Sequence, residues 1–452
     1  MHVVRIALEV FMVVITAWLS LSFLFQIFVS FWGFRKKTKD YEDHDPKLRF
    51  LVLVPAHNEE AVVQDIIENL KHMEYPKELY DFYILADNCT DQTASVSRQL
   101  GANVLEFNKQ NENEPTGKSI VLKKAFERLV DYQKNYDVVM FFDADNLLDF
   151  NMFTEVNSQF LSHPHADIIQ CYLGCKNNRG PVALFYYINY TIANRFLQYG
   201  RLRLSLNCGI GGTGFAVTTN YLHERGGWTA VSLTEDTELQ FAATLGGRHV
   251  LWNHHVRVYD EKPTTWRASY RQRVRWAQGH WFVAFRNTKK LFSAIWHKQI
   301  SPGEFFSTFM QMYFPCTYIL AIFNLLVMLL HHYMVTPASE LSFASFGQSL
   351  LSTFATIPAI VLFLYSLFVQ FLWADVVDNS ARFSLLLPFK VFFSFLLNSV
   401  LAGLAQIVGL FKYRQQDTWD KTDHRITRAE EDVLLSQTMV EASSRTDIPP
   451  SE

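Results

Sequence analysis

The sequence predicts an α/β domain with a parallel sheet, placed between apolar helices long enough to span a membrane. Short apolar runs alternate with amphipathic runs between residues 50 and 142, which is the pattern of strands and helices that follow one another. Uncharged apolar segments at residues 10–34, 305–330 and 341–374 flank this region. Charged residues make up 19% of the 452-residue chain, below the quarter that is typical of soluble domains, and this shift favours a membrane protein.

The first apolar segment, residues 10–34, is long enough to cross a bilayer at about 1.5 Å per helical residue. It is too long for a secretory signal peptide and has no small-residue cleavage site. Four basic residues follow at once, Arg35, Lys36, Lys37 and Lys39, and such clusters mark the cytosolic side. We therefore expect residues 1–40 to form an N-terminal transmembrane helix, with the next domain in the cytosol.

The central domain, residues 45–262, is expected to contain strands at 50–56, 81–86, 102–107 and 137–142 and helices at 59–73, 91–100 and 118–133. This alternation favours a parallel sheet, and ligands of such sheets collect at the carboxyl ends of the strands. The polar residues that follow the predicted strands are Asn58, Glu59, Asp87, Asp143 and Asp145.

Two carboxylates one residue apart, Asp143 and Asp145, follow the fourth predicted strand. Such a pair can share Mg²⁺ or Mn²⁺ and bridge it to substrate phosphates, although aspartates at strand ends also cap turns. Asp87 follows the second strand and is able to accept a hydrogen bond from a nucleotide base. Lys118, at the start of a predicted helix, is either a diphosphate partner or a solvated lysine.

Two further segments are candidates for contact with a substrate. Four glycines lie between residues 208 and 214, and such a loop either approaches a ligand closely or is simply flexible. Glu235 and Asp236 precede a short predicted helix, where a carboxylate is either a helix cap or a general base.

Residues 263–303 are expected to form amphipathic helices at the membrane interface. Within 264–287 an aromatic and aliphatic stripe recurs every three or four residues and would face lipid or packed helices. Gln272, Arg275 and Trp276 fall on the opposite side, where Arg suits a diphosphate and Trp suits the face of a sugar ring.

The C-terminal part is divided into apolar helices at 304–411 and a cytosolic tail at 412–452. The last apolar run, 383–411, contains Pro388 and Lys390 and is followed by a basic tail. An interfacial or re-entrant segment is favoured here over a simple membrane span, since a fourth crossing would place the basic tail outside. The net charge of −3 gives no indication of nucleic-acid binding, and the five scattered cysteines contain no C-x-x-C pair and fit reduced cytosolic thiols.

Five short motifs occur in one order: Val54-Pro55-Ala56-His57-Asn58-Glu59-Glu60, the segment 87–91, Asp143-Ala144-Asp145, Thr234-Glu235-Asp236 and Gln272-Arg273-Val274-Arg275-Trp276. Together they resemble the family 2 membrane-integrated processive glycosyltransferases, the group of cellulose, hyaluronan, chitin and poly-N-acetylglucosamine synthases. The resemblance implies a GT-A (Rossmann-like) fold, a UDP-sugar donor, and Mg²⁺ or Mn²⁺ held by Asp143 and Asp145.

The resemblance also implies roles for individual residues. Asp236, with Glu235 beside it, is similar to the catalytic base. The implied nucleotide-sugar ligands are Ala56, Asn58, Glu59, Asp87, Lys118, Asp143, Gln272, Arg275 and Trp276. The implied acceptor contacts are Gly212, Thr213, Gly214, Phe215 and Trp276. Trp419 and Thr422 are similar to a tail element that closes over the nucleotide.

The function implied is inverting transfer that builds a β-linked polysaccharide and extrudes it across the cell (plasma) membrane, from a multi-pass protein with a cytosolic catalytic domain. The expected partners are the donor, a carbohydrate acceptor, the bilayer, and an accessory subunit or a second copy. The alternative is non-processive transfer of one sugar to a lipid or polyprenyl-phosphate acceptor, and a scaffold without activity is a third interpretation.

Overall fold

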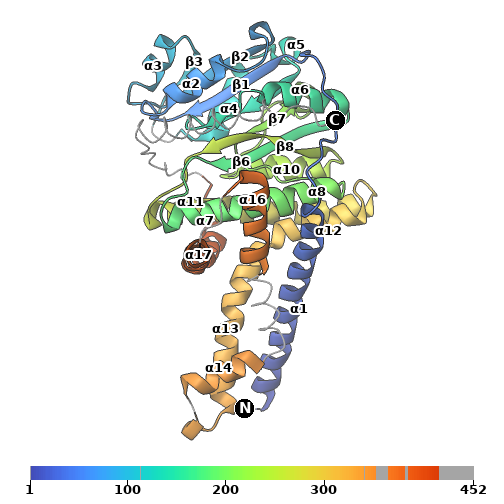
Figure 1. The fold of residues 1–452 in the computed structure, drawn as a ribbon, viewed down its shortest axis with the longest axis vertical. Helices are drawn as coiled ribbons and strands as arrows, with labels where there is room; N and C mark the ends of the chain where they lie inside the picture. The colour runs from blue at the N-terminus through green and yellow to red at the C-terminus, as the bar shows by residue number, and fades with distance from the viewer. Residues whose placement is uncertain (1, 112–113, 341, 353–364, 382–384, 417–452) are drawn as a thin grey trace.

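The computed structural model describes residues 2–416 except 112–113, 341, 353–364 and 382–384. Within this part an α/β body carries one mixed sheet, and long helices extend away from the body (Figure 1). The strands are β1 (Phe50–Ala56), β2 (Tyr80–Asp87), β3 (Asn103–Phe107), β4 (Val138–Phe141), β5 (Leu147–Leu148), β6 (Ala166–Cys175), β7 (Phe215–Thr218) and β8 (His249–Asp260).

The strands of the described sheet are arranged in the order β3-β2-β1-β4-β7-β6-β8-β5. The predicted parallel arrangement is confirmed for the four strands predicted, because β1 pairs in parallel with β2 and β4, and β2 with β3. It is wrong for the sheet as a whole, because β7 runs antiparallel to both β4 and β6, and β5 antiparallel to β8. The direction of a strand depends on where the chain re-enters the sheet, which a local apolar pattern does not encode.

Both faces of the central strands are covered by helices, which explains why these strands are apolar throughout. In β1, Phe50, Val52 and Val54 pack on one side, with α2 (Val63–Lys71) and α6 (Met152–Ser162). Leu51 and Leu53 pack on the other side, with α4 (Lys118–Arg128) and α10 (Glu235–Leu245). All five side chains are fully buried.

The predicted helices exist but are shorter than expected. The expected helix at 59–73 begins only at α2, because Asn58 takes a positive φ of 57° and residues 59–62 form a turn. The expected helix at 91–100 is α3 (Thr93–Gln99), and the one at 118–133 is divided into α4 and α5 (Tyr132–Asn135). The other elements of the body are η1 (Lys77–Leu79), α7 (Pro181–Ile192), η2 (Ala193–Tyr199), α8 (Gly200–Arg203) and α9 (Thr219–Glu224).

Three helices of the described chain are long and apolar enough to cross a membrane: α1 (His2–Gly33), α13 (Pro315–Val335) and α17 (Leu387–Lys412). α1 and α13 lie side by side and extend away from the sheet along the length of the molecule, whereas α17 is seen nearly end-on beside the body (Figure 1). The axis of α17 therefore runs across those of the other two helices.

The remaining apolar segments are less regular than the sequence indicates. The run at 305–330 is divided between α12 (Pro302–Tyr313) and α13, which begins at Pro315, because proline cannot donate the backbone hydrogen bond of a continuing helix. The run at 341–374 lies partly outside the described residues. Its described parts, and the short helix before it, are η3 (Ala338–Glu340), α14 (Phe343–Ser352), η4 (Tyr365–Phe371) and the start of α16 (Leu372–Asn379).

The predicted amphipathic helix is a 31-residue helix, α11 (Trp266–Trp296), but its predicted apolar stripe is only partly correct. Ala277 and Trp281 of the stripe are buried, whereas Trp266 and Phe285 are about 40% exposed. The reason is close packing on several sides: a Cβ added at Gly409 of α17 would lie 2.3 Å from the Cβ of Ala277. α11 therefore packs closely between the body and α17.

Candidate active site

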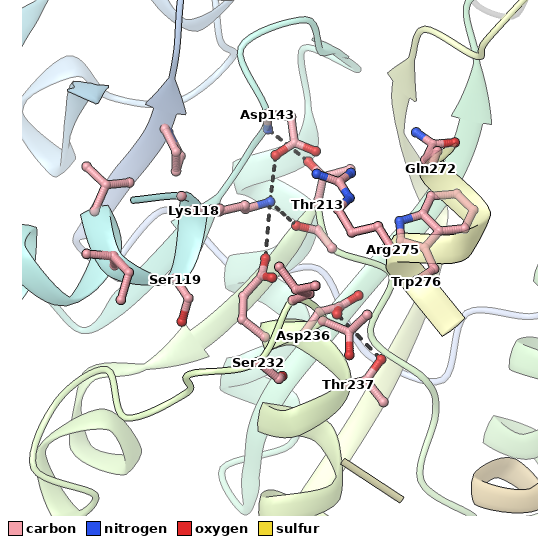
Figure 2. A pocket seen from close by; sticks show the side chains of 18 of the residues that line it. Lys118, Ser119, Asp143, Thr213, Ser232, Asp236, Thr237, Gln272, Arg275 and Trp276 are labelled. Carbon is pink, nitrogen blue, oxygen red and sulfur yellow. Dashed lines mark hydrogen bonds and ion pairs between the residues drawn. The ribbon is translucent and has the colours of Figure 1, made fainter. Parts of the chain in front are cut away.

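A cavity of about 880 Å³ lies at the carboxyl ends of β1, β2 and β4. α11 and the chain just after α17 close its other side. Lys118, Asp143 and Arg275 come from distant segments and point toward one another (Figure 2). The residues that line it include those predicted from the sequence: Ala56, Glu59, Asp87, Lys118, Asp143, Asp145, Gly212, Thr213, Glu235, Asp236, Gln272, Arg275 and Trp276.

Lys118, the first residue of α4, occupies the centre of this cavity (Figure 2). Its Nζ lies 2.6 Å from Asp143 Oδ1, 2.6 Å from the carbonyl oxygen of Gly212, and 3.6 Å from Glu235 Oε1. Burial by itself would lower the pKa of Lys118, but the carboxylates of Asp143, Glu235 and Asp236 outweigh it and raise this pKa above its ordinary value. The side chain is therefore a fixed positive charge among carboxylates that come from separate parts of the chain.

Glu235 and Asp236 form the first turn of α10, and both line the cavity. Burial raises the pKa of Glu235 to about 7; Lys118 opposes this shift and Asp236 adds to it. The pKa of Asp236 is also raised, first by burial, while the backbone N–H of Thr237 and the charge of Lys118 oppose the shift. Thr237 Oγ1 also donates a hydrogen bond of 3.4 Å to Asp236 Oδ1. The two carboxyl groups thus hold protons more readily than free acids do.

The raised pKa of Glu235 predicts a pH-dependent stability. The folded protein binds the Glu235 proton up to about pH 7, whereas the unfolded chain releases it near the ordinary value of 4.5, so this stabilisation is complete below 4.5 and is lost as the pH rises through 7. Glu235→Gln should therefore reduce the loss of stability between pH 5 and pH 8 by up to about 3 kcal/mol. Thermal unfolding across this range, without added divalent cation, measures it; the same pH dependence in both proteins would contradict it.

Asp87, at the end of β2, is buried and already accepts hydrogen bonds within the protein. Its Oδ2 accepts from the backbone N–H of Gly117 at 3.1 Å, and its Oδ1 accepts from Asn88 Nδ2 at 2.6 Å. Burial raises its pKa, and these hydrogen bonds oppose the shift. A carboxylate has further lone pairs, so Asp87 can still accept a hydrogen bond from a ligand.

The carboxylates that could contact a cation are arranged as an open group rather than a closed cage. Asp145 is 5% exposed, and its Oδ2 accepts from the backbone N–H of Glu261 at 3.0 Å. Asp260, at the end of β8, also lines the cavity; its Oδ2 pairs with Lys262 Nζ at 2.5 Å. No group of three or more His, Cys, Asp or Glu residues arranged to hold a metal is found in the part of the chain described. The carboxylates of Asp143 and Asp145 in one cavity fit Mg²⁺ or Mn²⁺, which commonly takes its other ligands from water and a substrate diphosphate.

α11 presents the predicted Gln272, Arg275 and Trp276 to the cavity from the side opposite Lys118 (Figure 2). The hydroxyl of Tyr186 donates to Gln272 Oε1 at 3.0 Å, and its ring meets the Trp276 ring edge-on at 6.1 Å between centroids. One residue of α11 sets how closely this helix approaches α10: a Cβ added at Gly279 would lie 2.6 Å from Thr234 Oγ1. A glycine there lets α11 contact the residue that precedes the Glu235–Asp236 pair.

The structure does not bring every predicted residue to the cavity. Asn58 lies beside it and accepts a hydrogen bond from the backbone N–H of Thr90 at 2.7 Å, so it holds two loops together. Gly214 and Phe215 are also absent from the lining, and Phe215 is fully buried and stacked on Phe141. The predicted tail residues Trp419 and Thr422 lie outside the described residues.

Several lining residues were not predicted from the sequence: Tyr190, Asp260, His280, Pro315, Gln406, Arg414, Gln415 and Gln416. Asp260 could have been found as an aspartate at a strand end, as Asp143 was. Gln416 lies 180 residues after Asp236 in the chain, yet its Oε1 accepts from the backbone N–H of Leu233 at 2.8 Å. No local pattern indicates such a contact.

The fold and the cavity are those of a GT-A-type enzyme, with an acidic site at the carboxyl ends of a mixed sheet. Residues 46–279, just over half of the chain, match the family described as glycosyltransferase like family 2. The chain belongs to this family and is a glycosyltransferase, so the prediction of family 2 is confirmed, and the membrane-integrated, processive character stays a prediction.

Curated relatives of more than one kind are similar to this chain. A probable glycosyltransferase, YdaM of Bacillus subtilis, is 27% identical over 60% of this chain and 66% of its own length. The β-monoglucosyldiacylglycerol synthase of Nostoc is 27% identical over 50% of this chain and 48% of its own length. The poly-β-1,6-N-acetyl-D-glucosamine synthase of Staphylococcus epidermidis is 24% identical over 53% of this chain and 58% of its own length. The chain thus spans about half to two thirds of the relatives it matches.

Among solved structures, the mannosyltransferase PcManGT from Pyrobaculum calidifontis, in complex with GDP-Man and Mn²⁺, is similar with a TM-score of 0.55. The match covers 86% of this chain and 99% of that chain at 16% identity. At this identity the similarity shows a shared fold.

Proposed function

We propose that this glycosyltransferase moves a sugar from a UDP-sugar to an acceptor hydroxyl with inversion at the anomeric carbon, and builds a β-linked polymer. One observation carries the proposal. Asp87, the Lys118–Asp143 pair, Asp236 and the α11 residues Arg275 and Trp276 line a single cavity, although they come from distant parts of the chain.

The donor would lie along the carboxyl ends of β2 and β4. Asp87 is placed to accept a hydrogen bond from the base, and Lys118 offers a fixed positive charge to the diphosphate. Asp143 and Asp145, with Asp260 nearby, would hold Mg²⁺ or Mn²⁺ together with diphosphate oxygens, and the bound cation would stabilise the charge of the leaving nucleotide.

Asp236 is the proposed base. It accepts the proton of the acceptor hydroxyl while the acceptor oxygen forms a bond to the anomeric carbon and the bond from that carbon to the diphosphate oxygen breaks. Arg275 stabilises the negative charge that develops on the departing UDP. Attack from the face opposite the leaving group converts an α-linked donor into a β-linked product.

The polymer product is supported by Trp276, since an indole held by Tyr186 at the cavity wall is suited to stack on an acceptor sugar. The second candidate is transfer of one sugar to a membrane lipid. It is supported by the lining residues Pro315 and Gln406, which belong to the candidate spanning helices α13 and α17. In both cases the catalytic domain would lie on the cytosolic face of the cell membrane, with an accessory subunit or a second copy as a possible partner.

Both proposals are tested with purified full-length protein in lipid nanodiscs, incubated with a panel of UDP-sugars and Mg²⁺ or Mn²⁺. We expect release of UDP with at least one donor, its loss on chelation of the cation, and a product of high molecular mass on size-exclusion chromatography. A single new glycolipid would replace the polymer proposal by the second one. Release of nucleotide from GDP-sugars alone would contradict the donor assignment.

A further inference from the structure

A second cavity, of about 240 Å³, lies beside the active-site cavity between α1, α8, α10, α11 and α12. The two cavities share Thr237 and His280 as lining residues. Thr237 is also the residue that donates to Asp236, so the second cavity lies next to the proposed base, on the side away from the Asp143–Lys118 pair. Nothing in the donor or acceptor assignments above uses its lining residues.

The second cavity contains a buried arginine that forms no ion pair with the described residues. Arg201 of α8 is 9% exposed and lines the cavity. In the described part of the chain no carboxylate forms an ion pair with its guanidinium, and its buried Nε has no hydrogen-bond partner. Burial lowers the pKa of Arg201, whereas the nearby Cys208 and Glu304 act in the opposite direction.

Glu304 is the carboxylate whose charge acts on Arg201, but among the described residues it forms no ion pair with the guanidinium. Glu304 is engaged elsewhere: its Oε2 accepts from the backbone N–H of Asn207 at 2.9 Å, and its Oε1 accepts from Thr308 Oγ1 at 3.0 Å. A buried guanidinium without a partner is costly, so a site that keeps one is suited to bind an anion. A second buried donor without a partner among the described residues, the hydroxyl of Ser22, lines the same cavity.

The amides of Gln198, Gln240 and Gln311 are already hydrogen-bonded within the cavity wall. Gln198 accepts from the backbone N–H of Gly209 and donates to its carbonyl oxygen, and Gln240 donates to Gln311 at 2.7 Å. These amides therefore form the wall of the cavity and are not free to bind a ligand. Arg201 is the charged hydrogen-bond donor that remains for a ligand. Between them lie apolar side chains from three helices: Phe25, Phe241, Met310 and Phe314. The cavity thus combines one cationic group with an apolar lining, which suits an amphiphile better than a free anion.

The depth of the cavity along α1 agrees with such a ligand. Gln26 of α1 lines it, and Gln26 lies seven residues, or about 10 Å, before the end of the helix at Gly33. α1 is a candidate membrane span whose basic flank, Arg35 to Lys39, lies just beyond Gly33. With α1 spanning a bilayer and this basic flank at the lipid headgroups, the cavity would lie at the boundary between headgroups and acyl chains.

We propose that this second cavity binds the phosphate of an anionic membrane lipid, with Arg201 as its ligand and the apolar walls holding the first part of the acyl or glycerol moiety. Because Thr237 and Gln240 of α10 line the cavity, an occupied site would also stabilise the helix that carries Asp236. The site does not depend on which sugar is transferred or on the acceptor, so it is tested separately from the proposed function.

The test measures thermal unfolding of the full-length protein in nanodiscs of phosphatidylcholine alone and of phosphatidylcholine mixed with phosphatidylglycerol. We expect phosphatidylglycerol to raise the Tm of the wild type by roughly 5 °C. Arg201→Met should abolish the rise without lowering the Tm in phosphatidylcholine alone, because among the described residues the guanidinium forms no ion pair and its Nε makes no hydrogen bond. Arg201→Lys, which keeps the charge but loses the forked donor, should retain a smaller rise.

Arg203→Met is the matched control, since Arg203 is an exposed arginine of the same helix that donates to Thr38 Oγ1, and it should keep the full rise. Inorganic phosphate added to phosphatidylcholine nanodiscs should give no comparable rise. A rise that survives Arg201→Met would overturn the proposal, as would an equal effect of inorganic phosphate. A lower Tm of Arg201→Met in phosphatidylcholine alone would instead show that Arg201 is a structural residue.

Discussion

Replacing Asp236 by asparagine is expected to lower the turnover number by about 10³-fold, which is within the range that a general base contributes. The amide has nearly the shape of the carboxylate but cannot accept the acceptor proton. Donor binding should persist, because Lys118 and Asp143, which face the proposed diphosphate site, keep their 2.6 Å ion pair. Asp236→Asn should therefore separate binding from chemistry.

The measurement is the rate of UDP release together with the dissociation constant of the UDP-sugar for the same preparation. Asp131→Asn is a suitable control, because Asp131 is exposed, pairs only with Lys134 on the surface, and lies outside the active-site cavity. Turnover of the Asp236 variant close to that of the control would rule out Asp236 as the base. Loss of donor binding in the variant would assign Asp236 to the donor site instead.

Replacing Lys118 by methionine is expected to abolish transfer and to destabilise the protein by about 1–3 kcal/mol, less than the loss of a partner from a fully buried ion pair, because the Asp143 side chain is 41% exposed. Lys118 pairs with Asp143 at 2.6 Å and lies 3.6 Å from Glu235, and its side chain is 17% exposed. Without the charge of Lys118, the carboxylates of the active-site cavity repel one another, and little water is present to screen this repulsion.

Thermal or denaturant unfolding measures the loss of stability, and the loss should become smaller at low pH, where Glu235 takes up a proton. Added Mg²⁺ or Mn²⁺ should restore part of the stability, because a cation can replace the missing charge beside Asp143. Lys134→Met, at the surface pair with Asp131, is the control and should change stability by less than about 1 kcal/mol. A Lys118 variant as stable as this control would contradict the central role of Lys118.

Local patterns in the sequence predicted the first half of the sheet well. The strands β1 to β4 lie where apolar runs end in polar residues, because a strand covered on both faces must be apolar throughout. The ends of the helices were less predictable. Pro315 marks a boundary that the apolar run hides, and the positive φ of Asn58 delays α2 by four residues relative to the prediction.

The sequence predicted most of the residues that line the active-site cavity. It did not predict which residues of a predicted segment reach the cavity and which belong to the core. Glycine-loop residues were assigned as a block, yet Gly212 and Thr213 line the cavity whereas Phe215 belongs to the core. The functional roles of all these residues stay predictions until the variants are measured.

The sequence by itself determined the family, the first apolar helix and most of the acidic residues of the site, because each depends on a short run of neighbours in the chain. Only the tertiary structure decided the antiparallel course of β7, the contact of Gln416 with Leu233, and the isolation of Arg201 in its own cavity. These features depend on which distant segments meet. Whether a buried charge is paired depends on the packing of several helices at once, and no local pattern of residues records that.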